Sequence, residues 1–482
     1  MRLKELLSGI CETEISDFEV TKLCWDNRKE IPHNSLFVCI EGKTFDAHSV
    51  AHLMLEKGAG AVVTNRSLGL DREIVVKDTR EALSLLCANW FLNPQKKLKL
   101  IGITGTNGKT TTATTVKRLL TAHGFKTGLI GTCDVEIGDE IYEGERSNPT
   151  TPEPYELFEI FNCMADKGCE YAVMEVSSQG LEQKRVFGCE YEAGVFTNLT
   201  QDHLDVHGTM ENYYQAKKML FDISKIKLSN LDDEWGNRLF SETKNATSFS
   251  SQKKADYYAD EIILSANGCE YCVNHNNEKY NTFFKMPGEF NVSNSLVALA
   301  VCDKLGFSLE KSAQLLKNLD GVCGRAEVVS KDVDFTVIRD YAHSPDAVEK
   351  ILKAIRAVSK GRVICLFGCG GNRDAKKRPL MAIAAAENSD FCIVTSDNPR
   401  NEDPEMIISD ILVGMENQTT PYVKITDRKE AIRYALENAK TDDVIAIVGK
   451  GHEDYQILKD GVKIHFDEKE IVEEILLDMK NR

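Results

Sequence analysis

The sequence predicts an α/β protein of three domains. A chain of 482 residues is too long for a single hydrophobic core. Apolar runs of six or seven residues, when they alternate with helices, are typical of parallel strands that are buried on both faces of a sheet. Such runs recur between stretches of helical pattern at 98–104, 171–176, 193–199, 362–368, 390–396 and 443–449.

The domain boundaries follow from turn-forming residues and from changes of pattern along the chain. We expect a first domain at 1–97, with a linker that begins at Asn93. The second domain, at 98–326, is expected to carry a mostly parallel sheet and an antiparallel section at about 256–284. The third, at 327–482, repeats strand and helix, which predicts a Rossmann-like domain.

One helix of the third domain is clearly marked. Ser344 is suited to its N-cap, and Pro345 to its first helical position. A stripe of apolar residues at helical spacing follows, which predicts one buried face. Its members are Val348, Ile351, Leu352, Ile355 and Val358.

The composition excludes several classes of protein. A net charge of −16 argues against a nucleic-acid-binding protein, which would carry a basic face. No apolar stretch approaches the roughly 18 residues of a membrane span, and the first residues lack the apolar core of a signal peptide. The 15 cysteines follow no framework, which suits a reducing compartment. We therefore expect a cytoplasmic protein with no nucleic-acid partner and no membrane insertion.

One cysteine pair could suggest a metal site. Cys269 and Cys272 have CxxC spacing, and His275 is close to them in the sequence. A zinc site needs a second pair of ligands at comparable spacing, which the sequence lacks. We interpret the segment as a hairpin with Asn267 and Gly268 at its turn.

The strongest signal for function is a glycine-rich loop between a predicted strand and a predicted helix. It consists of Gly105, Thr106, Asn107, Gly108, Lys109, Thr110 and Thr111. Glycines let the backbone fold around phosphate oxygens, Lys109 suits the β- and γ-phosphates, and the Thr110 hydroxyl suits Mg²⁺. The usual GxxxxGK[ST] spacing requires glycine where this chain has Ile103, so the motif is a shortened variant. The context predicts a P-loop ATPase-type domain that binds ATP.

Three residues that follow this loop in the sequence, Glu175, His203 and Lys217, carry groups suited to metal binding. Glu175 lies near the end of a predicted strand, where a carboxylate at the sheet edge could hold Mg²⁺. His203 and Lys217 follow the next predicted strand. Taken alone, His203 is equally compatible with a capping or core histidine, and Lys217 is most simply a solvated lysine. Only their combination gives these residues significance.

Nine short motifs occur in order along nearly the whole chain. They are GTNGKTT at 105–111, EVSSQGL at 175–181, TNLTQDHLDVHG at 197–208, YYQAKK at 213–218, SNLDDE at 229–234, PGEFNVSNSLVALA at 287–300, GRAE at 324–327, DYAHSPDA at 340–347 and GKGHEDYQ at 449–456. This set resembles the Mur ligase family, and within it the ligases that add the third residue of the peptide stem. The resemblance implies an ATP-dependent acid–amino-acid ligase of peptidoglycan (cell-wall) precursor synthesis.

The resemblance also implies a reaction in two steps. ATP phosphorylates the terminal carboxylate of a UDP-N-acetylmuramoyl dipeptide, and the incoming amine then attacks the acyl phosphate. Lys217 matches a lysine that is carbamylated in the family (N6-carboxylysine), which replaces a cation by an anion able to ligate Mg²⁺. With Glu175 and His203 it would support two Mg²⁺ ions. The family positions that contact adenine, phosphate and ribose are matched, in that order, by Asn291, Arg325 and Asp340.

A binding site for the UDP-sugar peptide is implied as well. Asn27 stands where the family usually has serine, and its amide offers both a donor and an acceptor. Without the family context, the same segment would be interpreted as an Asx-turn. Arg185 has the planar fork that suits a carboxylate or a pyrophosphate. The other matched positions are Lys43, Thr44, Phe45, Thr150, Thr151, Ser177 and Gln183.

Four residues directly after a predicted strand concern the incoming amino acid: Asp397, Asn398, Pro399 and Arg400. In isolation they indicate only a turn that contains proline. In the family this string marks enzymes that add meso-diaminopimelate rather than L-lysine. Arg400 suits the second carboxylate of diaminopimelate and would repel the ammonium of L-lysine, while Glu453 would pair with the distal ammonium. The set is completed by Arg373 and Gly449.

Other functions stay open on the sequence alone. One alternative is the same ligation with L-lysine. Another is a folylpolyglutamate synthetase-like ligase, which shares the phosphate loop but has no reason to carry a separate UDP-binding domain. A nucleotide-dependent switch would leave Arg373, Arg400 and Glu453 unexplained. We expect a monomer in each case.

Overall fold

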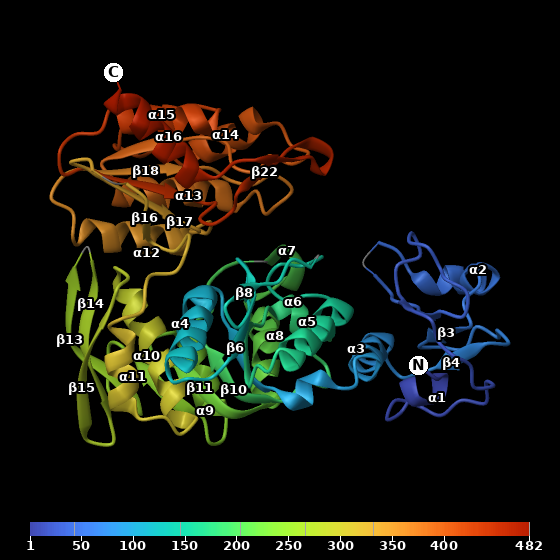
Figure 1. The fold of residues 1–482 in the computed structure, drawn as a ribbon. Helices are drawn as coiled ribbons and strands as arrows, with labels where there is room; N and C mark the ends of the chain where they lie inside the picture. The colour runs from blue at the N-terminus through green and yellow to red at the C-terminus, as the bar shows by residue number, and fades with distance from the viewer. Residues whose placement is uncertain (43, 145, 203, 266, 331, 482) are drawn as a thin grey trace. The chain divides into compact units, whose positions relative to one another are not determined.

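The computed structural model describes residues 1–482 with the exceptions of 43, 145, 203, 266, 331 and 482 (Figure 1). The chain divides into two compact units, one of 1–104, 124–194 and 216–226, the other of 105–123, 195–215 and 227–482. The described strands form sheets of four, 11, six and two strands. Among the described helices, none combines the length and the apolar character that crossing a membrane requires.

The first unit begins with a parallel sheet in the order β1-β2-β3-β4. Its inner strands are buried on both faces, since Val38 and Val63 join one apolar cluster while Phe37 and Val62 join another. The strands are β1 (Leu23–Cys24), β2 (Leu36–Val38), β3 (Ala61–Thr64) and β4 (Glu73–Val75). The helices are α1 (Leu3–Leu6), α2 (Ala51–Glu56) and α3 (Thr79–Trp90).

The 11-stranded sheet is mixed and has the order β15-β14-β13-β12-β11-β10-β5-β9-β6-β7-β8. Parallel pairs join β5, β9 and β6, and join β11, β12 and β13. The two ends of the sheet are antiparallel. Its strands are β5 (Lys99–Thr104), β6 (Thr127–Ile130), β7 (Val135–Ile137), β8 (Glu140–Ile141), β9 (Tyr171–Glu175), β10 (Tyr191–Phe196), β11 (Ser224–Asn230), β12 (Thr247–Ser250), β13 (Tyr257–Ser265), β14 (Gly268–His275) and β15 (Glu278–Phe284).

Helices follow most of the parallel strands in this part of the chain, whereas β13, β14 and β15 follow one another directly. The predicted antiparallel section at about 256–284 is therefore confirmed. The helices are α4 (Lys109–Ala122), α5 (Pro154–Asp166), α6 (Ser178–Glu182), α7 (Leu204–His207), α8 (Met210–Asp222), α9 (Glu234–Glu242), α10 (Glu289–Lys304) and α11 (Leu309–Leu316).

The six-stranded sheet has the order β16-β17-β21-β18-β19-β20 and is parallel except for β16. Its strands are β16 (Glu327–Val328), β17 (Thr336–Asp340), β18 (Val363–Phe367), β19 (Phe391–Val394), β20 (Tyr422–Lys424) and β21 (Val444–Val448). Its helices are α12 (Pro345–Arg356), α13 (Lys377–Asn388), α14 (Pro404–Val413), α15 (Arg428–Glu437) and α16 (Glu468–Lys480). A separate ribbon pairs β22 (Tyr455–Ile457) with β23 (Lys463–His465).

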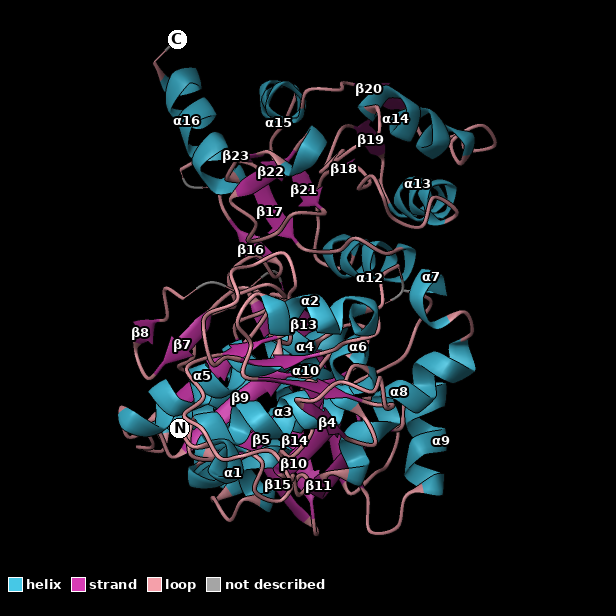
Figure 2. Cartoon of the chain, turned by 90° about the vertical axis from the view of Figure 1, so that its right-hand side faces the viewer, coloured by secondary structure: helices cyan, strands magenta, loops and turns pink. Residues whose placement is uncertain are grey.

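Both faces of the six-stranded sheet are covered by helices, and alternation along β18 shows why. Cys365 packs with residues of α12, α13 and α14, whereas its neighbours Ile364 and Leu366 pack with residues of α15 and α16. Figure 1 shows α15 and α16 on one side of the sheet and α12 on the other, and Figure 2 shows β17 and β21 side by side between them. The predicted helix after Ser344 is confirmed, with the Ser344 hydroxyl accepting from Ala347 N.

Candidate functional site

The predicted phosphate loop joins β5 to α4, which begins at Lys109 as expected. Gly108 has a left-handed backbone (φ 83°), and a Cβ there would collide with Oδ1 of Asn294. Gly105 also has a positive φ, of 151°, and a Cβ there would collide with Thr197. Only glycine permits both close approaches, so the loop can curve tightly at the amino end of a helix.

The phosphate loop is held by the residues that directly follow β10. Asn107 N donates to Asn198 Oδ1 at 2.9 Å, and Thr197 Oγ1 donates to Asn107 O at 2.6 Å. Thr106 N donates to Asn198 O at 2.9 Å. These three bonds set the loop backbone without using a charged group. Thr197 and Asn198 belong to the motif at 197–208, and their place directly after a strand is the sequence signal for this role.

Two basic side chains lie at the phosphate loop. Lys109 Nζ donates to the carbonyl oxygens of Gly105 and Thr106, at 2.9 and 2.8 Å. Arg325 Nη2 donates to Thr110 Oγ1 at 2.8 Å. The loop thus combines backbone N–H groups, a helix amino end and two cations, an arrangement suited to a polyphosphate.

Asp340, the predicted ribose contact, ends β17 close to Arg325. Its carboxylate accepts from the backbone N–H groups of Ala326 and Ala342, at 2.7 Å each. Burial raises the pKa of Asp340, against the opposing effect of the Arg325 guanidinium. The Arg325 guanidinium also lies 4.4 Å from the centre of the Tyr341 ring.

Asn291, the predicted adenine contact, is fully buried in α10. Its Nδ2 donates to Pro287 O at 2.8 Å, and its Oδ1 accepts from Asn294 Nδ2 at 3.0 Å. Asn294 in turn lies against Gly108, so α10 braces the phosphate loop. Asn294 is not among the predicted site residues, although it stands in the same motif as Asn291.

Glu175 ends β9 in the first unit and is 1% exposed. Its two oxygens accept from Thr132 N at 2.8 Å and from Thr132 Oγ1 at 3.0 Å, and Thr132 Oγ1 lies 3.0 Å from Thr150 Oγ1. Lys217, in α8, is also buried, at 2% exposure. His203 lies outside the described residues. Thr132, which is not among the predicted site residues, orients the carboxylate.

Three of the positions matched to the UDP-sugar peptide site, Thr151, Ser177 and Gln183, come together around Arg185. Its Nη1 donates to Thr151 O at 2.8 Å, its Nη2 donates to Gln183 Oε1 at 2.6 Å, and Glu153 pairs with it at 3.0 Å. Ser177 N donates to Thr151 Oγ1 at 2.9 Å. Burial lowers the pKa of Arg185 and raises that of Glu153. The guanidinium is therefore held firmly in a buried setting.

The Asp-Asn-Arg segment at 26–28 forms an Asx-turn. Arg28 N donates to Asp26 Oδ1 at 3.0 Å, and the Arg28 guanidinium pairs with both carboxylate oxygens at 2.8 Å each. Thr44 and Phe45 are exposed, and Lys43 lies outside the described residues. The turn explains the local conformation of this segment and leaves its binding role as a prediction.

A second candidate site, here called the amino-acid pocket, lies beyond the carboxyl ends of β19 and β21. Asn398 Nδ2 donates to Glu453 Oε2 at 2.9 Å. Lys450 Nζ donates to the same oxygen at 2.9 Å and to Asn398 Oδ1 at 3.3 Å. The three side chains close a ring of hydrogen bonds between the two segments. Ligands of open α/β sheets bind at this edge.

Arg400 lies beside a glycine turn in the amino-acid pocket. It has a left-handed φ of 52°, and its Nη1 donates to Gly371 O at 2.9 Å. A Cβ on Gly370 would come within 2.8 Å of the same Nη1, so glycine leaves the guanidinium its space. Burial, and then the neighbouring charge of Arg373, lower the pKa of Arg400. An anion bound here would relieve the repulsion between the two cations.

Asp397 is a buried carboxylate next to the amino-acid pocket. Asn398 N donates to Asp397 Oδ1 at 2.6 Å. Burial raises the pKa of Asp397, but the charges of Lys450 and Arg428 outweigh burial and leave the pKa below its ordinary value. Gly449 has a φ of 120°, and a Cβ there would come within 2.9 Å of Asp397 Oδ2. A larger residue at 449 would thus be strained and would crowd the carboxylate.

Arg428 ties together the two strands that carry the amino-acid pocket. Its Nη1 donates to Ser396 O at 3.2 Å and its Nη2 to Val448 O at 2.9 Å, just beyond β19 and at the end of β21. Its Nε donates to Glu468 Oε1 at 2.8 Å, and both side chains are fully buried. Burial raises the pKa of Glu468 in spite of Arg428. No motif pointed to this pair.

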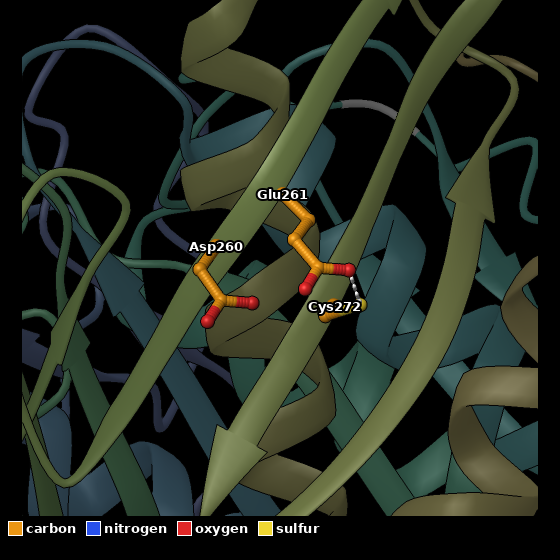
Figure 3. Close-up of side chains that lie close together, drawn as sticks. All are labelled: Asp260, Glu261 and Cys272. Carbon is orange, nitrogen blue, oxygen red and sulfur yellow. Dashed lines mark hydrogen bonds between the residues drawn. The ribbon is translucent and has the colours of Figure 1, made fainter.

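The CxxC pair does not make a metal site. Cys269 and Cys272 lie three positions apart on β14, so their side chains point to opposite faces of the sheet. Figure 3 shows Cys272 near Asp260 and Glu261, and Lys279 Nζ already pairs with those two carboxylates at 3.1 and 2.7 Å. Burial, and then the neighbouring Glu261, raise the pKa of the Cys272 thiol to about 11, which keeps it protonated.

Comparison with known proteins decides the family. The model of the Mur ligase middle domain matches residues 103–302, and the model described as Mur ligase, glutamate ligase domain, matches residues 324–451. UDP-N-acetylmuramoyl-L-alanyl-D-glutamate--2,6-diaminopimelate ligase 1 of Clostridium acetobutylicum is 44% identical over 488 aligned residues, covering 99% of this chain and 100% of that protein. The chain belongs to the Mur ligase family.

Other Mur ligases agree with this assignment. The 2,6-diaminopimelate ligase of Bacillus cereus is 42% identical, covering 96% of this chain and 95% of that protein. A solved structure with the same ligase title is 31% identical, has a TM-score of 0.67 and covers 96% of both chains. A folylpolyglutamate synthase structure from Mycobacterium tuberculosis is 16% identical, with a TM-score of 0.59 over 78% of this chain, and shares the fold alone. The predicted family and the α/β fold class are confirmed.

Proposed function

We propose that this protein is an ATP-dependent ligase that adds meso-diaminopimelate to UDP-N-acetylmuramoyl-L-alanyl-D-glutamate in peptidoglycan precursor synthesis. The proposal is supported by 44% identity over the whole chain to a relative of that name. The observation that carries the choice of amino acid is the pair of neighbouring cations, Arg400 and Arg373. Such a pair favours an amino acid with a second carboxylate.

In this proposal the phosphate loop binds the ATP triphosphate. Lys109 and Arg325 move their hydrogen bonds from the protein to phosphate oxygens, where charge builds up during phosphoryl transfer. Asn291 and Asp340 serve adenine and ribose. The carboxylate of the substrate's D-glutamate attacks the γ-phosphorus and releases ADP, which forms the acyl phosphate.

We also propose that Mg²⁺ accompanies the nucleotide. A hydroxyl at Thr110 and a buried carboxylate at Glu175 are the hard oxygen donors that Mg²⁺ prefers. His203 and an N6-carboxylysine at Lys217 would complete the ligands for two ions. Bound Mg²⁺ supplies positive charge that offsets the charge on the transferred phosphoryl group.

The second step joins the two substrates. The amine of diaminopimelate attacks the acyl carbon, and the tetrahedral intermediate collapses with loss of phosphate. Arg400 would hold the distal carboxylate bidentately, and Glu453 would accept from the distal ammonium. Holding the far end of the amino acid places its reacting amine at the acyl carbon, which lowers the entropy cost of the attack.

The UDP-sugar peptide is assigned to the buried setting of Arg185, whose fork suits a carboxylate or a pyrophosphate. Its neighbours in this role are Asn27, Lys43, Thr44, Phe45, Thr150, Thr151, Ser177 and Gln183. We further propose functional domains at 1–97, 98–326 and 327–482, and a cytoplasmic monomer. Free cysteines throughout the described chain fit a reducing compartment.

The test is a ligation assay that offers meso-diaminopimelate and L-lysine together with ATP and the UDP-N-acetylmuramoyl dipeptide. We expect ADP release only when dipeptide and amino acid are both present, and a product that contains diaminopimelate. Arg400→Met should reduce kcat/KM for diaminopimelate by about 100-fold, because a buried bidentate ion pair is lost. Preference for L-lysine in the unchanged protein would contradict the proposed substrate.

A further inference from the structure

Lys450 is a fully buried lysine that contacts two residues of the amino-acid pocket without having been assigned any role there. Its Nζ donates to Asn398 Oδ1 at 3.3 Å and to Glu453 Oε2 at 2.9 Å. Buried lysines are rare, because an ammonium is costly to remove from water unless it is paired. Here the pairing uses two groups of the binding site.

These bonds determine the orientation of the Asn398 amide and which oxygen of Glu453 is available to a ligand. Because Oδ1 of Asn398 accepts from Lys450, its amide nitrogen faces Glu453, to which it donates at 2.9 Å. Oε2 of Glu453 therefore receives two donors. Its other oxygen, Oε1, accepts no hydrogen bond from the described residues, and so it is the one available to a ligand.

Lys450 also changes the balance of charge. Lys450 pairs with Glu453 at 2.9 Å, the charges of Lys450 and Arg400 both act on Asp397, and Arg373 adds a further positive charge beside Arg400. Arg428 is matched separately by Glu468. With Lys450 present, the pocket carries an excess of positive charge and suits a group that brings both an ammonium and a carboxylate. A lone ammonium would meet repulsion in the same place.

We propose that Lys450 is a positioning residue that sets the amino-acid selectivity of the pocket. It holds Asn398 and Glu453 so that one carboxylate oxygen receives the distal ammonium, and its charge disfavours an amino acid that lacks the second carboxylate. The inference rests on the proposed function, whose amino-acid pocket it deepens. It differs from a purely structural role, because it predicts a change in preference between substrates.

The experiment replaces Lys450 by methionine, which keeps the length of the side chain and removes its charge. We expect KM for meso-diaminopimelate to rise about tenfold while kcat at saturation stays within about twofold. The ratio of kcat/KM for diaminopimelate to that for L-lysine should fall at least about tenfold. KM for ATP and for the UDP-N-acetylmuramoyl dipeptide should not change.

Lys440→Met is the matched control, because Lys440 is an exposed lysine of the same domain. Lys450→Gln is measured in parallel. If Lys450→Met fails to fold, the substrate ratio of Lys450→Gln tests the role of Lys450 instead. An unchanged ratio in the folded variants, or an equal loss of kcat with both amino acids, would overturn the role of Lys450. Preference of the unchanged protein for L-lysine would instead overturn the proposed function, so the two failures are distinguishable.

Discussion

The phosphate loop occupies consecutive residues at 105–111, whereas the amino-acid pocket draws on segments at 370–373, 397–400 and 449–453. The loop is shaped by glycine backbone angles and by neutral partners, Thr197 and Asn198. The pocket is shaped by two ion pairs, Arg428 with Glu468 and Lys450 with Glu453, and by the bonds of Arg428 to the ends of two strands. A continuous motif thus builds its site locally, while a discontinuous one depends on ion pairs for its geometry.

This difference leads to separate expectations for substitutions in the two regions. In the phosphate loop, losing a side chain should affect catalysis more than folding, because the backbone shape persists. In the amino-acid pocket, losing a supporting charge should reduce stability as well, because a buried partner is left unpaired. Both expectations can be measured.

The largest effect is expected for Lys109→Ala. Removing the ammonium should reduce kcat by roughly 10³-fold or more, since a cation at the phosphates stabilises charge in the transition state. The free energy of unfolding should change by less than about 1 kcal/mol. Phosphate release and thermal melting test the two parts, with the exposed Lys126→Ala as control. Activity within tenfold of the original would argue against the assigned role.

Arg428→Met should show the contrasting behaviour. It leaves Glu468 buried without its partner and breaks the bonds to Ser396 O and Val448 O. We expect a loss of about 3–5 kcal/mol in the free energy of unfolding, measured by denaturant titration. Adding Glu468→Leu should recover part of the loss, because no buried carboxylate is then left without a partner, while the bonds to Ser396 O and Val448 O stay broken. A loss below about 1 kcal/mol in the single variant would contradict the bracing role.

Gly108→Ala tests whether the loop depends on glycine geometry. The left-handed backbone and the collision with Asn294 should together cost about 1–3 kcal/mol and weaken ATP binding about tenfold. Gly124→Ala is a matched control, because Gly124 also has a positive φ, of 99°, but open space at its Cβ. Combining Gly108→Ala with Asn294→Ala should relieve the collision but not the backbone strain. Equal losses of stability in Gly108→Ala and Gly124→Ala would mean that the contact with Asn294 is unimportant.

The smallest effect is expected for Asp397→Asn, and it should depend on pH. The folded pKa of Asp397 lies below its ordinary value of about 3.9, so the charged carboxylate stabilises the fold above that pH. The variant should lose about 1–2 kcal/mol at neutral pH. This difference should shrink as the pH falls through the folded pKa, because the carboxyl group then becomes neutral. Urea titrations of both proteins from neutral to acidic pH measure this difference. If the difference in the free energy of unfolding stayed constant with pH, the role of the Asp397 charge would be contradicted.

Much of the fold could be predicted because it depends on local chemistry. The apolar runs became β5, β9, β10, β18, β19 and β21, and the Ser344-Pro345 cap started α12 at the expected residue. The prediction extended the helix stripe to Val358, but α12 ends at Arg356, so Val358 lies just beyond it. Helix ends are harder to predict than helix faces, because terminal residues make fewer bonds within the helix.

By itself, the sequence determined the family and the place of the phosphate loop between a strand and a helix, and it predicted the pocket residues from 397 to 400. Glycine angles, strand burial and helix caps depend on neighbouring residues, so a linear pattern expresses them. Only the tertiary structure decided that Thr132 orients Glu175, that Lys450 joins Asn398 to Glu453, and that Arg428 ties two strand ends. The reason is that these contacts join segments 32 to 52 positions apart in the sequence, Thr132 with Glu175, Asn398 with Lys450 and Ser396 with Arg428. A buried charge can be interpreted only with its partner in place.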